Sequence, residues 1–461
     1  MSRRVPAALA AAALCFAVAL PAAGEGESPL VSNLSPSGYV TASAWATPRA
    51  DDALSTAGLR GNVALSGDAG ETGAFKVALE WNANGAGLAD AGDAETSWYG
   101  PASFSASVAD RATLDLSLKE AWLSLYAGDF DFILGQQIVT WGQADGNNPT
   151  DNVNPRYVGT RDATATDEKK IPVPMVNVTW NLPSGNGAVQ GLFLPIPAVN
   201  RMPDMGGFVK EDIPGVSPEN LEGGARALFY LGQSSVSVSY LTILDRYPSD
   251  VTGFTRMMVS PMPPPEIFVN VPDTLGHTRR QIVGLDAVTF LGPYDLRAEW
   301  AYTLTDDPEG TDPYKKNPTL AGVVQGSRNF LDGRLSLALS WAPTWIQNFE
   351  EPPAQALTYA SQLYTGQGFA LEQAVAARAQ AKFLNETLQG EAMFLTELAA
   401  RDWLATVSGT YNLADGWNLK GGVNLHGSFR SSDDPLRQLG VFGNDSAQDS
   451  DSLYLELRFD F

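Results

Sequence analysis

The stretch SLYLELRFDF, residues 452–461, ends the chain and alternates strictly in polarity. Leucine or phenylalanine occupies every odd position from Leu453 to Phe461, and serine, tyrosine or a charged residue occupies every even one. Successive side chains of a β-strand point to opposite faces. This stretch therefore predicts a strand with one apolar and one polar face.

The same period of two recurs upstream, for example over residues 75–82, 295–302, 334–341 and 417–426. Short turns alternate with long polar segments between these strands, as in up-and-down antiparallel barrels that cross a membrane. The sequence thus predicts an all-β transmembrane barrel of about 16 strands. The range is about 14–18, because residues 389–413 fit either one long strand or two.

The N-terminus has the layout of a secretory signal. Arg3 and Arg4 precede an apolar run from Ala7 to Leu20, and small residues follow. We expect cleavage after Gly24, which divides the chain into a signal peptide (1–24), a short segment (25–37) and the barrel (38–461). A membrane anchor would need roughly 20 apolar residues. Lipidation at Cys15 is a second alternative to cleavage after Gly24, but it would cut the apolar run of the signal in two.

Composition excludes several classes of protein. The single cysteine, Cys15, lies in the predicted signal, so no disulfide or thiolate-metal site is expected. The chain has 52 Asp and Glu against 30 Lys and Arg, a net charge of −22, which argues against nucleic-acid binding. His277 and His426 are its two histidines, and they belong to no recognisable catalytic motif. No enzyme, cofactor or metal site is predicted.

Two long polar segments invite separate hypotheses. Residues 142–173 are predicted to fold inward as a constriction loop, with Asp145, Asp151, Arg156 and Arg161 facing the channel; the alternative is a solvated surface loop. Residues 353–388 include a run of helix formers, 370–381, and are predicted to hold a helix in an outer loop. That helix would either act as a lid or lie passively on the surface.

The polar faces of the predicted strands carry charges of both signs, and these residues are expected to line the pore. Either they bind polar or anionic solutes in passage, or they only hydrate the lumen and pair across strands. The pore-lining candidates are Arg60, Lys76, Glu80, Arg226, Arg297, Glu299, Arg334, Lys420 and Arg458.

Aromatic residues fall near the predicted strand ends. Trp81, Trp300 and Trp341 lie towards the long loops, whereas Trp180 and Trp417 lie towards the short turns. Two belts of aromatic rings are expected where a barrel meets the two membrane interfaces.

Two stretches resemble known families. The last strand, with Phe459 and the terminal Phe461, resembles the signal by which outer-membrane barrels are recognised by their assembly machinery. A second stretch resembles outer-membrane barrels with the hallmark G-R-Q-x-V-x-W-G, an acidic residue, then D-x-x-N-P, similar in style to alginate-export and other substrate-specific porins. The matching residues are Gly135, Gln137, Val139, Trp141, Gly142, Asp145, Asn154 and Pro155.

The second resemblance implies a barrel and transport. Gln136 stands where that family has arginine, so the substrate class does not carry over. The sequence as a whole predicts a porin-like channel of the bacterial outer membrane for passive diffusion of small polar or anionic solutes, as a monomer or a trimer surrounded by outer-membrane lipid. The alternative is a plugged barrel that serves as a surface antigen, adhesin or binding protein.

Overall fold

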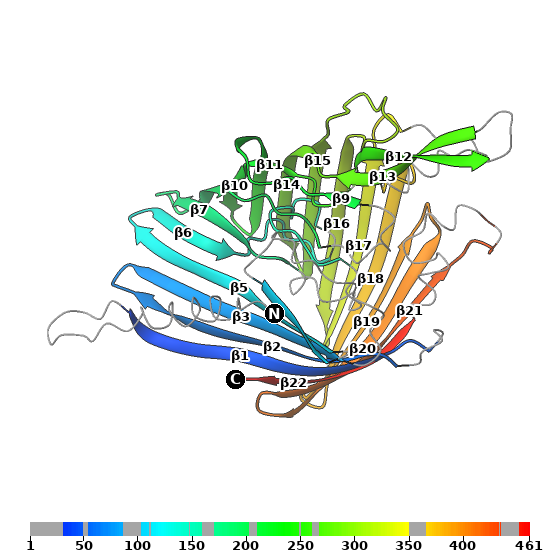
Figure 1. Cartoon of the computed structure of the whole chain (residues 1–461). Coiled ribbons are helices and arrows are strands. Elements are labelled where there is room, and N and C mark those ends of the chain that lie inside the picture. The colour runs from blue at the N-terminus through cyan, green and yellow to red at the C-terminus, as the bar shows by residue number, and fades with distance from the viewer. Residues whose placement is uncertain are drawn as a thin grey trace.

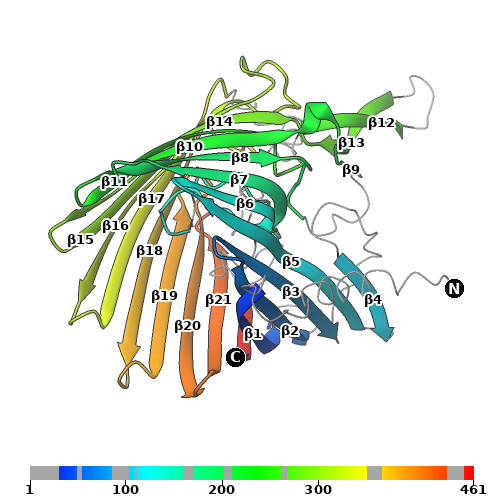
Figure 2. The ribbon, with the colours of Figure 1, turned by 90° about the vertical axis from the view of Figure 1, so that its left-hand side faces the viewer.

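The computed structural model describes residues 31–48, 54–85, 103–109, 112–146, 148–158, 170–201, 210–248, 250–260, 267–349, 366–432, 434 and 451–461. Antiparallel strands dominate these ranges, and Figures 1 and 2 show them side by side in one curved sheet. One short 3-10 helix, η1 (Pro218–Asn220), interrupts them. In these ranges no helix is long and apolar enough to cross a membrane. The predicted signal peptide, residues 1–24, lies outside them.

The described part of the chain forms a closed ring of 18 strands. In order around the ring these are β1 (Val31–Ala46), β2 (Leu54–Ala69), β3 (Gly73–Gly85), β5 (Ala112–Ala127), β6 (Phe130–Gln137), β7 (Val173–Asn181), β8 (Gly187–Leu194), β10 (Glu222–Leu231), β11 (Ser234–Leu244), β14 (Arg279–Leu291), β15 (Tyr294–Leu304), β16 (Thr319–Phe330), β17 (Leu335–Ile346), β18 (Leu371–Phe383), β19 (Leu388–Glu397), β20 (Asp402–Ala414), β21 (Trp417–Ser428) and β22 (Ser452–Asp460).

The last strand closes the ring. β22 pairs with β21 on one side and with β1 on the other, from Tyr39↔Asp460 to Ala46↔Leu453. Beyond β22, the amide of Phe461 donates to the carbonyl of Gly38 at 3.0 Å. The predicted alternation of this strand is therefore what joins the two ends of the sheet, and closure leaves no unpaired edge between them.

The strand count of about 16 was too low by two strands. Residues 389–413 form two strands, β19 and β20, and residues 371–383 form a third, β18. The turn before β19 holds Leu384, Asn385 and Glu386 at positive φ, and Arg401 does the same before β20. Neither turn contains glycine or proline, the strongest markers of a turn, and both turns were therefore missed.

The predicted helix within 353–388 is wrong over its described part. Residues 366–388 contain β18, which pairs with β17 from Leu335↔Ala381 to Trp345↔Leu371. Alanine favours a helix in isolation, but pairing with neighbouring strands overrides a weak local preference. A period of two is in fact present, because Arg378 and Gln380 point to one face and Ala377 and Ala379 to the other.

Three further features complete the fold. β1 begins at Val31, so the segment predicted as 25–37 already contributes to the sheet. β4 (Ser103–Ala109) pairs with the first residues of β5, beyond the point where the short β6 ends. β9 (Lys210–Asp212), β12 (Asp250–Ser260) and β13 (Ile267–Gly276) form a separate small sheet at the loop end.

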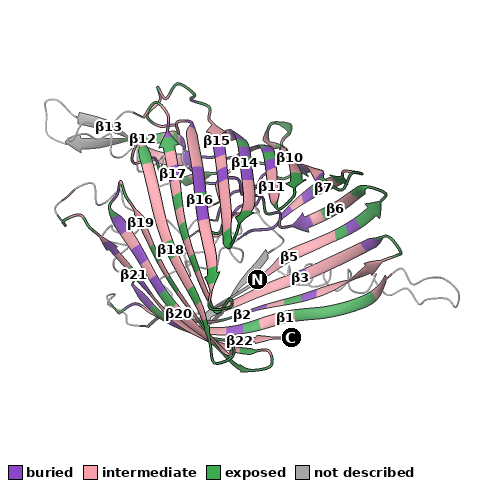
Figure 3. Ribbon diagram, turned by 180° about the vertical axis from the view of Figure 1, so that it is seen from behind, coloured by how far each residue is buried: buried purple, intermediate pink, exposed green. Residues whose placement is uncertain are grey.

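The outward face of the ring is apolar and exposed. Leu339 and Val407 are each 60% exposed, and exposed residues recur along the strands in Figure 3. Trp180, Tyr294 and Trp417 lie exposed at the turn end, where a belt of aromatic rings was predicted. A face of this kind matches hydrocarbon rather than water.

Candidate functional site

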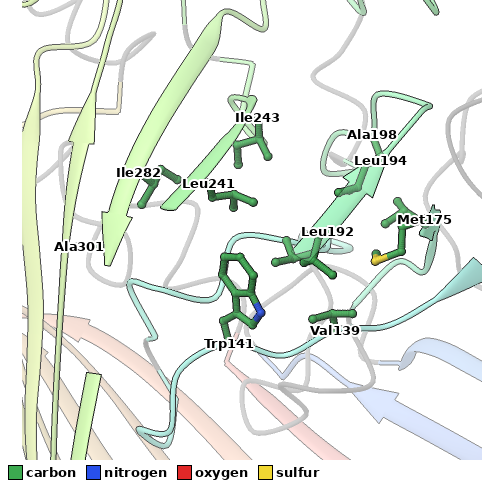
Figure 4. Packing of buried hydrophobic residues seen from close by; sticks show 12 residues of the cluster. Val139, Trp141, Met175, Leu192, Leu194, Ala198, Leu241, Ile243, Ile282 and Ala301 are labelled. Atoms are coloured by element: carbon green, nitrogen blue, oxygen red, sulfur yellow. The ribbon is translucent and has the colours of Figure 1, made fainter. Parts of the chain in front are cut away.

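The connection between β6 and β7 runs inside the ring and has an apolar side. We call its described residues, 138–146, 148–158 and 170–172, the lumen loop. Trp141 is 1% exposed, and its indole N–H donates to Gln190 Oε1 of β8 at 2.7 Å. Figure 4 shows Trp141 among inward-facing apolar side chains of the wall. The buried cluster comprises Val139, Trp141, Val153, Val173, Met175, Leu192, Leu194, Ala198, Leu241, Ile243, Ile282 and Ala301.

Trp141 therefore lies inside the ring and not at a membrane interface. The inward face of β7, β8, β11 and β14 is apolar at this level because the loop, and not water, covers it. Burial of a large apolar side chain contributes about 1.5–3 kcal/mol. The loop is therefore held against one side of the wall by a small core of its own.

Asn154 completes the backbone hydrogen bonding of the lumen loop. Its side-chain oxygen accepts from the amide of Val139 at 2.7 Å, and its Nδ2 donates to the carbonyls of Gln137 and Ile171 at 3.1 and 2.9 Å. Buried backbone groups without partners are costly. Asn154 thus joins the start, middle and end of the loop.

Asp151 is a buried carboxylate within the loop. It accepts from Arg156 at 2.7 Å and from Lys170 at 2.8 Å, and its side chain is 2% exposed. Removal of one partner from such a buried group would leave an uncompensated charge. Asp151 therefore stabilises the loop, and Arg156 reaches from it towards the open lumen with 28% of its side chain exposed.

Glu299 of β15 holds the loop from the wall. Its buried carboxylate accepts from the amides of Gln143 and Ala144 and from the hydroxyl of Thr150, the last two at 2.5 and 2.9 Å. Gly142 has φ +85, and a Cβ there would lie 2.5 Å from this carboxylate. Only glycine allows so close an approach of the loop backbone to the wall.

Arg297, two residues earlier on the same face of β15, is a second contact between wall and loop. Its guanidinium donates to the carbonyl of Gln143 at 2.7 Å and pairs with Asp145 of the loop at 3.1 Å and Asp295 of the wall at 2.8 Å. Gln325 of β16 also donates to the Asp145 carboxylate. The tip of the loop is thus fixed to β15 and β16.

Arg246, which follows β11 at the mouth of the barrel, binds the backbone of the lumen loop. It is buried, donates to the carbonyls of Asn152 and Val153, the latter at 2.7 Å, and pairs with Glu222 at 3.0 Å. Sequence reasoning missed Arg246, because nothing in its neighbourhood marks it as different from other arginines in loops.

A cluster of ion pairs supports this mouth. Asp245 lies 2.9 Å from Lys316 and 3.2 Å from Arg280, and Arg280 also pairs with Asp250 at 2.7 Å. Burial acts to raise the pKa of Asp245, but Lys316 and Arg280 outweigh it and hold that pKa below its usual value. The carboxylate is therefore ionised at neutral pH.

A polar space of about 400 Å³ separates the lumen loop from the wall of β16–β19. The loop contributes Thr140, Asp145 and Arg156 to its lining, and the wall contributes Arg378 and Glu391. The last two pair at 2.9 Å across β18 and β19. Sequence reasoning missed this pair, although polar residues alternating with alanine along 377–382 were a usable signal.

The remaining pore-lining candidates are distributed around the rest of the ring. Lys76 pairs with Glu120, and Glu80 pairs with Lys119 at 2.6 Å. Arg226 pairs with Asp286 of β14 at 3.0 Å.

Three more candidates lie near inner-wall tyrosines. The Arg458 guanidinium is 4.0 Å from the Tyr39 ring and that of Arg60 is 5.9 Å from it, while Lys420 is 5.5 Å from the Tyr454 ring. Arg334 lies in the turn before β17 and not on the wall, so its predicted place is corrected. The predicted constriction residue Arg161 falls outside the described ranges.

The hallmark residues are spread over the lumen loop, from the end of β6 to the tip of the loop. Gly135 has φ +120, and a Cβ there would lie 2.3 Å from the carbonyl of Ala121. The buried side-chain Nε2 of Gln137 donates to the carbonyl of Met175 at 3.3 Å, and the carbonyl of Pro155 accepts from the backbone amide of Ile171 at 2.7 Å. With Trp141, Gly142, Asp145 and Asn154 described above, these residues shape and anchor the loop.

Both histidines have places in the framework. His277 is buried, with Nε2 2.8 Å from Glu211 and Nδ1 2.6 Å from the carbonyl of Asp245, so it joins β9 to the mouth of the barrel. His426 Nδ1 lies 3.5 Å from Asp451, the residue before β22.

No protein-family model and no curated protein matches the chain. Solved structures of similar outline include a mutant of the porin of Rh. blastica, at 12% identity and a TM-score of 0.41, over 93% of this chain and 100% of that one. Another is OmpT, an outer membrane protein of Vibrio cholerae in its trimer form, at 10% identity and a TM-score of 0.40, over 93% and 99%. The fold assignment rests on the strand pairing of this chain itself.

Proposed function

We propose that the protein is a porin-type channel of the bacterial outer membrane, through which small polar solutes diffuse passively. The polar space between the lumen loop and β16–β19 supports this most directly. It lies inside a closed ring with an apolar exterior, and its lining offers charges of both signs. Water and polar solutes are the natural contents of such a space, whereas hydrocarbon suits the outer face.

In this proposal the lumen loop forms the constriction. Asp145 and Arg156 on the loop face Arg378 and Glu391 on the wall, so a solute passes between two charged surfaces. The burial of Trp141 and the contacts from Glu299 and Arg297 of β15 keep the lumen loop in a fixed position. Charged groups held in place select solutes by size and charge more sharply than mobile ones do.

Charge selectivity should be modest. Several wall cations are paired with carboxylates, including Arg226 with Asp286 and Arg378 with Glu391. Anionic solutes are therefore accepted among others, with no strong exclusion of cations.

Planar-bilayer recordings of the purified mature protein test the proposal. We expect ohmic single channels, a reversal potential near zero in a salt gradient, and a larger conductance after deletion of residues 147–166. A protein that inserts but never conducts would favour the plugged barrel, the alternative of a surface antigen, adhesin or binding protein. Unchanged conductance after the deletion would remove the loop from the channel. Mass measurement in detergent would decide between monomer and trimer.

Export by the signal peptide 1–24 and recognition of Phe459 and Phe461 by the barrel-assembly machinery complete the proposal. The Phe459 ring lies 4.7 Å from the Trp417 ring and 6.0 Å from the Phe461 ring, and the alternation of the last strand puts both phenylalanines on its outward face at the turn end. Deletion of Phe461 should lower the amount of folded protein in outer-membrane fractions, and an unchanged amount would reject its role as an assembly signal.

A further inference from the structure

An apolar groove of about 890 Å³ runs along the outer face of β16–β20. Its floor is made by small residues of β18, Ala377 and Ala379, and its sides by Leu339 and Trp341 of β17 and Phe394 of β19. The row of small side chains lowers the surface between two rows of large ones.

The strand register places the groove on the lipid side of the wall and not in the lumen. Leu339 pairs with Ala377, and Ala377 pairs with Phe394, so the three side chains share one face. Directly paired residues of neighbouring strands project to the same side of a sheet. Leu339 is 60% exposed and Phe394 is 41% exposed, as the apolar outer face requires.

An arginine lies at the turn end of this apolar groove. Arg328 of β16 pairs with Leu337 on one side and with Tyr294 on the other, which puts it on the outer face. Its guanidinium lies 4.7 Å from the Phe330 ring and donates to the Tyr294 hydroxyl at 3.1 Å. Its Nε is buried and has no hydrogen-bond partner among the described residues.

A cation on the lipid face is costly unless it reaches a polar partner at the interface. Arg328 stands two residues before the end of β16, close to the membrane surface on the side of the short turns. In barrels of this architecture the short turns are periplasmic. The available anion at that level is the phosphate of a lipid headgroup, which arginine binds with several donors.

We propose that the groove binds one glycerophospholipid of the periplasmic leaflet, with its phosphate on Arg328 and an acyl chain over Ala377 and Ala379. Leu337, which pairs with Arg328, and Trp341, at the far end, are four residues apart, or about 13 Å along the strand. That length is close to half of a hydrocarbon core of about 30 Å, the depth of one leaflet. A second copy of the barrel fits the groove less well than a phospholipid, because its chiefly apolar outer face would offer the Arg328 guanidinium no anion.

Native mass spectrometry of the full mature chain, released from detergent, tests this inference. The probes are phosphatidylglycerol and a diacylglycerol with the same two acyl chains. We expect wild-type protein to retain one phosphatidylglycerol and little diacylglycerol. R328Q should weaken phosphatidylglycerol retention by about fivefold or more, the effect of one basic residue at a charged lipid surface. A379L should weaken it too, by filling the floor of the groove.

R334Q is the matched control, because Arg334 lies in the adjacent turn and does not line the groove. It should bind like wild type, and R328K should retain more lipid than R328Q. Wild-type conductance of each variant would show that it has folded. Equal retention by R328Q and wild type, or equal retention of the two probes by wild type, would overturn the phosphate site. If A379L lowered only the oligomeric mass and left lipid retention unchanged, the groove would be a contact between copies and the inference would be wrong.

Discussion

Glu299 is the position at which the docking of the lumen loop can be tested most sharply. Its carboxylate accepts from two loop amides, those of Gln143 and Ala144, and from the Thr150 hydroxyl. The substitution Glu299→Ala leaves both amides without that acceptor. Each buried donor left unsatisfied costs about 1–3 kcal/mol, so the docked loop should be destabilised by about 2–6 kcal/mol.

A factor of ten in an equilibrium corresponds to about 1.4 kcal/mol. The undocked population of the loop should therefore rise at least about 30-fold in Glu299→Ala. Glu299→Gln keeps one oxygen as an acceptor and should have a smaller effect. Asp295→Ala is the matched control, since it removes a lumen-facing carboxylate from the same strand but takes no acceptor away from the loop backbone.

Two measurements read out this change. Single-channel recordings should show larger or noisier open-channel currents for Glu299→Ala than for Asp295→Ala. Trypsin should also cleave after Arg156 faster in Glu299→Ala than in Asp295→Ala. In the docked loop the backbone of Arg156 is hydrogen-bonded to Asn200 and Arg201, which keeps this peptide bond out of the protease active site. Equal currents and equal cleavage rates in the two variants would refute the idea that Glu299 holds the loop.

Three further predictions address other parts of the site. Trp141→Ala should cost about 3–5 kcal/mol by opening a cavity in the loop core; a lower denaturation temperature in detergent checks this, and an unchanged one would contradict it. Arg378→Gln should shift the reversal potential in a salt gradient towards cations and Glu391→Gln towards anions, and equal shifts in one direction would count against their place in the channel. Because the pKa of Asp245 is lowered on folding, its stabilising effect is present above about pH 4, the ordinary value, and is lost as the pH falls through the lowered pKa. Asp245→Asn should therefore be less stable than wild type at pH 7 by a margin that persists to about pH 4 and shrinks below it, as denaturation temperatures at pH 7, 4 and 2 would show; a margin that had vanished by pH 5 would contradict the low pKa.

The barrel could be predicted because the alternation of polar and apolar residues is a property of each single strand. Alternation along one strand, as in residues 452–461, reports which side faces lipid, and the neighbours of that strand are not needed to see it. The missing strands were hidden by residues such as Leu384 and Arg401, which adopt positive φ in turns without glycine. Pairing partners, and not the sequence of the turn, fix the backbone there.

The candidate site was predictable in part, because the charges on inward faces follow from the same alternation. The partners of Glu299 did not follow, since Gln143 is 156 residues away in the chain. The apolar inward face beneath Trp141 also breaks the alternation rule, because protein and not water covers it. Contacts of this kind depend on how a long connection folds, and local patterns do not record that.

The lumen loop also constrains the order in which the chain can assemble. Its anchors on the wall lie on β8, β11, β14, β15 and β16, a set of strands from the middle of the chain, whereas the final joint is made by β1 and β22 at its ends. The connection can therefore settle onto a half-built, still open sheet before the two ends meet. If the barrel closed first, the whole connection of roughly 35 residues between β6 and β7 would have to enter through the mouth of the barrel.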